Sequence, residues 1–452
     1  MAQKIRLATA SPATQASTAA TLAQLSRIAH RAASLGVDIL LLPEAYLGGY
    51  PRGATFGCAI GARSEAGRDE YLDYFRKAVD LGDTVGDGGA GAGRAWVRRE
   101  LAGDAVGGDE PQGTDGAEAR KRGDGTREEL ERIARETGVF LVTGLIEKAG
   151  GSLYCAAVYV CPKQGIIGKR RKVMPTASER LIWAQGSPAT LRAVSTVIRG
   201  VRINMAAAIC WESYMPLLRQ ALYAQNINLY LAPTADGRDA WLGLLRTVGV
   251  EGRCFVVSSN MCVRGGTAAP ATNGHREEAV AAAADRPVYD PRRRRSSAIT
   301  EEGFEIALPS LRSEAAPRGK VARRRSVLDE DGNEIVLCAK ESVVHEETIV
   351  NEEAVAAEGE ADATAANGIA PNAVKQPAVP FISRGGSSIV SPFGDVLAGP
   401  QWEDDEGIVC ADVDFDDCIR GRLDLDAAGS YSRNDSFKFS VEGLDLSPLP
   451  YA

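Results

Sequence analysis

The chain has 452 residues, of which 44% are hydrophobic, and this is enough for a large buried core. A formal net charge of −8 argues against nucleic-acid binding by the chain as a whole. The nine cysteines are scattered, without the dense regular spacing of a disulfide framework, so we expect reduced thiols. No apolar run resembles a signal peptide or reaches the roughly 18 residues that a membrane span needs. The sequence therefore predicts a cytoplasmic protein without a membrane partner.

Strand and helix patterns alternate from the N-terminus onward. Residues 4–10 are expected to form a strand, and residues 18–35 a helix with apolar side chains at helical spacing. Residues 37–43 are a near-continuous apolar run, typical of a strand buried on both faces, and Glu44 follows it directly. A short helix is expected within residues 63–82. Its aromatic side chains favour a core or subunit contact over a substrate site.

Two stretches interrupt this alternation. Glycine and charged residues dominate residues 84–125, where we expect a flexible surface insertion. Residues 264–380 combine arginine clusters with an alanine and glutamate tract and almost no aromatics, which predicts a long disordered or weakly ordered insertion. Within it, residues 334–338 can form a small hairpin. We expect one domain over residues 1–445, interrupted twice, and a tail at 446–452.

The centre of the chain carries a basic run and a cysteine, each after a predicted strand. Residues 154–160 are expected to form a strand, and the basic run 168–176 that follows is, taken alone, typical of a solvated surface loop. The apolar run 203–210 ends on Cys210 and leads into the helical pattern 215–225. This order places the cysteine at the carboxyl end of a strand, where α/β proteins locate their chemistry. Cysteines are also often buried for packing alone, so position does not by itself identify a nucleophile.

Three segments of the chain carry a glutamate, a lysine and a cysteine, each after a predicted strand. They are LPEAYLGGYPRG from Leu42, GKRRKVMPTASERLIWAQG from Gly168, and AAAICWESYMPLLRQALYAQNINLYLAPTADGRDAW from Ala206. These segments resemble the signature blocks of the nitrilase, or carbon–nitrogen hydrolase, superfamily, in which the three residues follow strands in that order. The Cys-Trp-Glu sequence within the last segment resembles the nitrilase branch.

The resemblance implies a fold and a set of catalytic residues. The implied fold is α/β, an αββα four-layer sandwich of the carbon–nitrogen hydrolase type, whereas the alternation alone fits a doubly wound sheet equally well. The implied catalytic residues are Glu44 as general base, Lys172 for stabilisation of the intermediates and Cys210 as nucleophile. Glu179, seven residues beyond the lysine, is implied as a supporting residue. The final segment, residues 414–435, is implied to contain a closing helix.

Each implied role suits the residue type. A free cysteine with a pKa near ~8.5 is mostly protonated at neutral pH, so attack on a nitrile carbon needs a base. Glu44 can take that proton if burial raises its own pKa. Lys172 supplies positive charge where negative charge develops.

The loops after these strands are expected to shape a substrate pocket. Tyr50, Trp183, Trp211 and Thr234 are the candidate lining residues, although a packed core position suits Trp183 equally well.

The implied activity is that of a nitrilase, which hydrolyses organic nitriles to carboxylic acid and ammonia through a cysteine thioimidate and an acyl-enzyme. The expected partners are a small nitrile, water and further copies of the chain, as a dimer or a larger spiral. The alternatives are a cyanide hydratase or an amidase of the same superfamily, or a non-catalytic scaffold. We expect no cofactor and no metal, because histidine occurs only three times and no CxxC or HExxH spacing exists.

Overall fold

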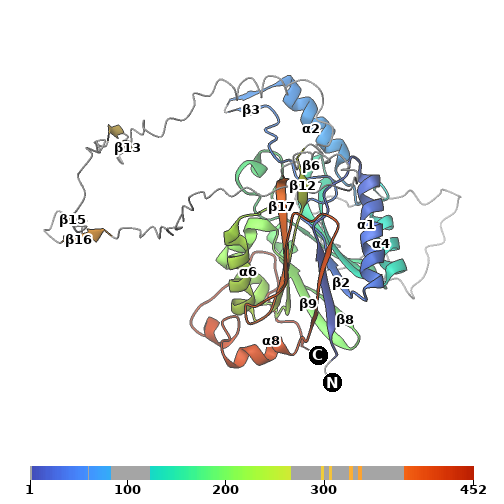
Figure 1. Ribbon diagram of the computed structural model, residues 1–452, viewed down its shortest axis with the longest axis vertical. Helices are drawn as coiled ribbons and strands as arrows, with labels where there is room; N and C mark the ends of the chain where they lie inside the picture. Colours follow the sequence, from blue (N-terminus) through green and yellow to red (C-terminus); the bar gives the residue numbers. More distant parts are fainter. Residues whose placement is uncertain are drawn as a thin grey trace, which may run out of the picture. The chain divides into compact units, whose positions relative to one another are not determined.

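The computed structural model describes residues 3–59, 61–82, 123–265 and 381–451, together with four short strands between residues 297 and 337 (Figure 1). Contacts divide the chain into two units. The first comprises Met1–Asn273 and Gln376–Ala452, and the second comprises Gly274–Lys375. All the candidate site residues belong to the first unit.

The first sheet of this unit has the strand order β19-β1-β2-β5-β6-β7. Strands β1, β2 and β5 are parallel to one another, whereas β6 is antiparallel to both β5 and β7. Strands β5 and β7 therefore point in the same direction. The strands are β1 (Ile5–Ala10), β2 (Ile39–Leu41), β5 (Phe140–Ala149), β6 (Ser152–Cys161), β7 (Gly165–Arg171) and β19 (Ile408–Val413).

The second sheet has the order β12-β17-β11-β10-β9-β8, and β18 also pairs with β17. Its central strands β9, β10 and β11 are parallel, and the pairs at its sides are antiparallel. The strands are β8 (Val194–Ile198), β9 (Val201–Ala207), β10 (Leu229–Thr234), β11 (Phe255–Asn260), β12 (Cys262–Arg264), β17 (Phe381–Val390) and β18 (Val396–Trp402).

Helices cover the outer face of each sheet. Helices α1 (Thr18–Ser34) and α4 (Thr126–Thr137) pack on the first sheet, and α5 (Pro216–Tyr223) and α6 (Asp239–Gly252) pack on the second. Figure 1 shows α1 and α4 together on one side of the sheets and α6 on the other. The remaining helical elements are α2 (Glu65–Lys77), α8 (Asp417–Arg420) and the 3₁₀ helices Ala177–Leu181, Pro188–Leu191, Cys210–Tyr214, Gly421–Leu423 and Ser430–Ser432.

The strand sequences explain why the two sheets face each other. In β1, Ile5 and Leu7 point into an apolar core between the sheets, and Ala8 and Ala10 point toward the helix layer. Side chains alternate across a strand, so a strand that is apolar on both faces must be covered on both faces. The outer helices and the facing sheet provide that cover. The expected αββα four-layer sandwich is confirmed.

Two local expectations are wrong. The first part of the basic run, residues 168–171, lies in a buried strand, β7, and not in a solvated loop, because Glu147 and Glu212 lie beside its basic side chains. The segment 414–435 forms only the one-turn helix α8 and short 3₁₀ turns, and not a closing helix. Closely spaced aspartates in this segment accept hydrogen bonds from nearby backbone N–H groups, as turns require.

Within the second unit, the described residues form two antiparallel hairpins. Strand β15 (Arg325–Leu328) pairs with β16 (Glu334–Leu337), which confirms the hairpin expected near residue 334. Strand β13 (Ser297–Ile299) pairs with β14 (Glu305–Ala307). The rest of the insertion expected at 264–380, and most of that at 84–125, lies outside the described residues.

No helix in the described ranges combines the length and the apolar character needed to cross a bilayer.

Candidate active site

The sheet topology brings three strand ends together. Glu44 lies three residues beyond the end of β2, Lys172 directly follows β7, and Cys210 lies three residues beyond the end of β9. Because β2 and β7 point in the same direction, their carboxyl ends lie at the same edge of the first sheet. A short stretch of backbone therefore suffices to bring the glutamate to the lysine.

Lys172 lies between two carboxylates. Its Nζ is 2.7 Å from Oε1 of Glu44 and 2.8 Å from Oε2 of Glu179, and all three side chains are buried. Glu179 is itself held by the backbone N–H of Thr176 at 2.7 Å and by the hydroxyl of Tyr50 at 2.8 Å. The arrangement fixes a cation beside a carboxylate inside the protein, where the low dielectric strengthens their attraction.

Cys210 lies in a strained turn. Its φ angle is 55°, which is unusual for a residue other than glycine, and it begins the 3₁₀ helix Cys210–Tyr214. The thiol is 4% exposed, and its sulfur accepts a hydrogen bond of 3.2 Å from the hydroxyl of Thr234, the last residue of β10. The turn thus directs the sulfur into the buried cluster that also contains Ala45 and Trp183.

Burial and neighbouring charges alter the acidity of these groups. Burial raises the pKa of Glu44, and the charge of Glu179 adds to this effect while Lys172 opposes it. Burial raises the pKa of Cys210 to about 12; the charge of Glu44 adds to this effect, and Lys172 and Thr234 oppose it. Burial alone would lower the pKa of Lys172, but the anionic groups around it, first Glu44, raise it well above its ordinary value. The lysine therefore stays charged, whereas the thiol stays protonated unless a base takes its proton.

Comparison with known proteins assigns the chain to a family. Residues 4–279 match the carbon-nitrogen hydrolase family. The chain belongs to this family. Over 440 residues it is 31% identical to an arylacetonitrilase of Trametes versicolor, with 94% of each chain covered, which places it in the nitrilase branch.

A second relative agrees with this assignment, and a solved structure agrees with the fold. The chain is 31% identical to an aliphatic nitrilase of Sinorhizobium fredii, with 94% of this chain and 90% of the relative covered. The crystal structure of Nit3 of Saccharomyces cerevisiae, a member of the nitrilase superfamily, superposes with a TM-score of 0.50 at 12% identity, covering 96% of this chain and 97% of that one. At this low identity the second comparison supports the fold alone.

In this family member, three of the four expected pocket residues lie with the catalytic candidates. Tyr50 contacts Trp183 edge-on with ring centroids 5.6 Å apart, and Lys172 Nζ lies 5.6 Å from the centre of the Trp183 ring. Thr234 contacts the sulfur of Cys210 directly. Trp211 is different: it is 36% exposed, and its indole N–H donates to Asp236.

Several side chains that support the site were not identified from the sequence. Glu212 accepts hydrogen bonds from the backbone N–H of Ile209 at 2.8 Å and of Val173 at 2.7 Å, so it connects the segment before the cysteine to the segment after the lysine. Tyr74 of α2 accepts the indole N–H of Trp183 at 3.1 Å and donates to the backbone oxygen of Gly49 at 2.9 Å. The sequence places Tyr74 among the aromatic side chains of residues 63–82, but this pattern does not show what the tyrosine hydroxyl binds.

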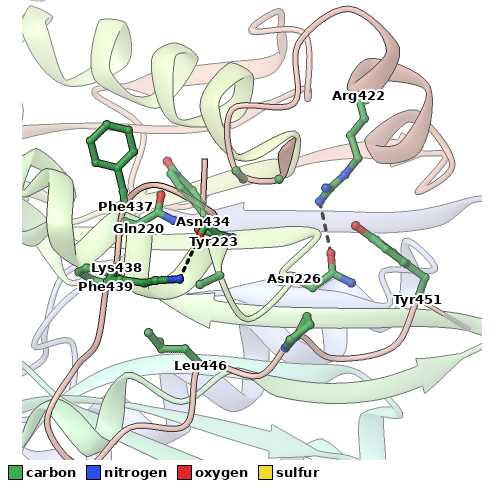
Figure 2. Close-up of a pocket in the computed structure, with 14 residues that line it drawn as sticks. Gln220, Tyr223, Asn226, Arg422, Asn434, Phe437, Lys438, Phe439, Leu446 and Tyr451 are labelled. Atoms are coloured by element: carbon green, nitrogen blue, oxygen red, sulfur yellow. Dashed lines mark hydrogen bonds between the residues drawn. The ribbon is translucent and has the colours of Figure 1, made fainter. Parts of the chain in front are cut away.

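A separate cavity lies away from these groups. It has a volume of about 430 Å³ and lies between the end of α5 and the C-terminal segment (Figure 2). In Figure 2, Arg422 reaches toward Asn226, and Lys438 reaches toward Asn434. None of the candidate catalytic residues lines it.

The described part of the chain holds no cluster of three or more histidine, cysteine, aspartate or glutamate side chains that could bind a metal ion.

Proposed function

We propose that the chain is a nitrilase that hydrolyses organic nitriles to carboxylic acids and ammonia, with Glu44, Lys172 and Cys210 as catalytic residues. The observation that carries the proposal is the buried Glu44–Lys172 contact beside a strained cysteine whose sulfur accepts a hydrogen bond. A scaffold needs neither a buried ion pair nor backbone strain at this position, because both cost stability.

The first chemical step is addition of the cysteine to the nitrile. The Cys210 sulfur attacks the nitrile carbon while Glu44 takes the thiol proton and passes it to the nitrile nitrogen, which gives a thioimidate. A positioned base of this kind contributes about 10²- to 10⁴-fold to the rate. The Lys172 ammonium stabilises the negative charge that develops on nitrogen.

Two molecules of water complete the reaction. The first attacks the thioimidate carbon with Glu44 as base, and the tetrahedral intermediate expels ammonia to leave a thioester between Cys210 and the acyl group. The second water hydrolyses this acyl-enzyme, which releases the carboxylic acid and restores the thiol. Glu179 acts through Lys172 by holding its ammonium group at 2.8 Å. If the first tetrahedral intermediate loses sulfur before ammonia, the product is an amide.

The test is release of ammonia and acid from aromatic, arylaliphatic and aliphatic nitriles, from their amides and from cyanide. We expect nitrile turnover by the native protein and none by Cys210→Ala. Cys161→Ala is the matched control, because Cys161 is also a buried thiol but packs in the core between the sheets. Turnover of amides or cyanide alone would instead favour an amidase or a cyanide hydratase. A folded native protein that turns over none of them would favour a scaffold.

We also propose that the protein is a homo-oligomer, a dimer or a larger spiral. Large apolar side chains remain exposed in this unit, among them Leu217 at 70%, Leu423 at 91% and Phe437 at 70%. Exposed apolar side chains of this size are candidates for contacts between copies of the chain. Light scattering coupled to gel filtration tests this, and a monomer at micromolar concentration would contradict it.

We further place the protein in the cytoplasm, because its scattered cysteines suit a reducing compartment. Cell fractionation tests this location.

A further inference from the structure

The candidate site contains a second buried thiol that the reaction above does not use. Cys155 lies in β6, and its Sγ is 3.5 Å from Oε1 of Glu44. Its backbone carbonyl accepts a hydrogen bond of 2.7 Å from the N–H of Lys172. Cys155 therefore contacts the candidate base through its side chain and the lysine through its backbone.

The two thiols of the site form hydrogen bonds of opposite direction. The sulfur of Cys210 accepts from Thr234, and such a bond favours the thiolate. The thiol of Cys155 instead donates to a carboxylate, and burial together with the charge of Glu44 raises its pKa well above the ordinary value. A neutral thiol is a weak donor. Cys155 is therefore a donor to the base, whereas Cys210 is suited to become the nucleophile.

The two oxygens of Glu44 lie in different surroundings. Oε1 receives the ammonium of Lys172 at 2.7 Å and the thiol of Cys155. Oε2 is buried and has no hydrogen-bond partner among the residues that the structure describes. An oxygen that already accepts two hydrogen bonds holds an additional proton less well. The proton from Cys210 or from water is thus expected at Oε2.

We propose that Cys155 is a positioning residue for the general base: with Lys172 it occupies Oε1 of Glu44 and directs proton transfer to Oε2. This inference rests on the proposed function of Glu44 as the base. Cys155 thereby adds a fourth side chain to the glutamate, lysine and cysteine of the site, and it fixes the rotation of the Glu44 carboxylate.

The sign of the expected pH effect follows from this contact. A donor on Oε1 stabilises the ionised carboxylate, so its removal raises the pKa of Glu44. Activity that needs ionised Glu44 then begins at higher pH. The titratable groups that act on Glu44 or are acted on by it are Lys172, Glu179, Cys155, Cys210, Tyr50 and Tyr74.

The experiment compares Cys155→Ala, which removes the donor, with Cys155→Ser, which supplies a stronger one. We expect the acidic limb of kcat/KM to move to higher pH by roughly half a unit to one unit in Cys155→Ala, so that turnover on this limb falls about three- to tenfold. In Cys155→Ser the limb should move to lower pH. Cys161→Ala, a buried thiol at the other end of the same strand, should leave the limb in place.

The ionisation of Glu44 can also be followed without nitrile turnover, as the low-pH rise in the rate of Cys210 alkylation by iodoacetamide, a step in which Glu44 takes the thiol proton. Peptide mass spectrometry measures the alkylation. If the native protein turns over no nitrile, the proposed function fails, but the alkylation profile still decides the role of Cys155. Unchanged limbs in folded Cys155→Ala and Cys155→Ser would overturn the proposal. If Cys155→Ala does not fold, Cys155→Ser alone tests the proposal. An acidic limb at the native pH in that variant would overturn it.

Discussion

Oε2 of Glu212 lies 2.5 Å from Nη2 of Arg170, and both side chains are almost completely buried. The same carboxylate accepts hydrogen bonds from the backbone N–H groups of Ile209 and Val173, which are adjacent to Cys210 and Lys172 in the chain. We expect Glu212→Gln to reduce kcat about 10- to 100-fold, because small displacements of both groups misalign the reaction. Steady-state kinetics on the best nitrile measures this.

Loss of this carboxylate should also cost stability. Arg170 would remain buried without its anion, so the free energy of unfolding should fall by about 3–5 kcal/mol in urea titrations. The double variant Arg170→Met with Glu212→Gln should recover part of this stability but not kcat, since the backbone contacts stay altered. Native kcat in either variant would show that Glu212 does not position the catalytic loops.

The carboxylate of Glu44 should affect two measurable quantities, the rate of nitrile turnover and the pKa of Cys210. Because the pKa of Glu44 is raised above its ordinary value of 4.5, kcat/KM should rise with pH along a limb that lies above that value. Glu44→Gln should abolish turnover because the base is lost. It should also lower the pKa of Cys210 from about 12, because a negative charge that opposes the thiolate is removed while Lys172 remains.

The high-pH rise in Cys210 alkylation, where the thiol ionises without a base, measures the pKa of Cys210. The control is Glu129→Gln, a partly exposed glutamate paired with Arg132 on α4, which should leave the Cys210 profile unchanged. A Cys210 pKa that stays the same or rises in Glu44→Gln would contradict the assigned charge relationship.

Gly144 in β5 allows the Glu44 segment to approach the sheet. A Cβ added at this glycine would lie 2.3 Å from the carbonyl oxygen of Pro43 and 2.7 Å from Cα of Glu44. Gly144→Ala should therefore displace the base, lowering kcat/KM by about 100-fold and stability by about 1–3 kcal/mol. Kinetics and thermal unfolding measure the two effects.

The matched control is Gly243→Ala in helix α6. Apart from its chain neighbours and the backbone of its own helix, no heavy atom of the described residues would lie within 4 Å of that added Cβ, and alanine is the better helix former. This variant should keep full activity and gain up to about 1 kcal/mol. Equal kinetics for the two alanine variants would mean that the tight approach at Gly144 is unimportant.

Glu147 should be a major source of stability for the first sheet. Its carboxylate lies 2.5 Å from Nζ of Lys169 and 2.7 Å from Nε of Arg171, and all three side chains are buried. Glu147→Ala should reduce the free energy of unfolding by about 3–5 kcal/mol, because two buried cations lose this carboxylate. Glu129→Ala breaks only partly exposed pairs and should cost about 1 kcal/mol or less. Similar midpoints in urea for the two variants would contradict this difference.

Much of this protein could be predicted from local sequence. The apolar runs before Glu44 and Cys210 identify buried strands, because side-chain burial on both faces needs no information from distant residues. The order of glutamate, lysine and cysteine after such strands, together with the three matching segments, indicated the family and the αββα fold. The positions of the catalytic candidates at strand ends were therefore available before any coordinates.

Only the tertiary structure decided which charged and polar groups are paired. Three consecutive basic residues favour a solvent-exposed position when taken alone. Residues 169–171 instead lie in the buried strand β7, because Glu147 and Glu212 approach them from elsewhere in the chain. The same holds for the two thiols. Cys155 and Cys210 both lie in apolar runs, and only their distant neighbours, a carboxylate for one and a threonine hydroxyl for the other, give their hydrogen bonds opposite directions. Hydrogen-bond direction depends on contacts between distant segments, and a sequence pattern of period two or 3.6 carries no record of them.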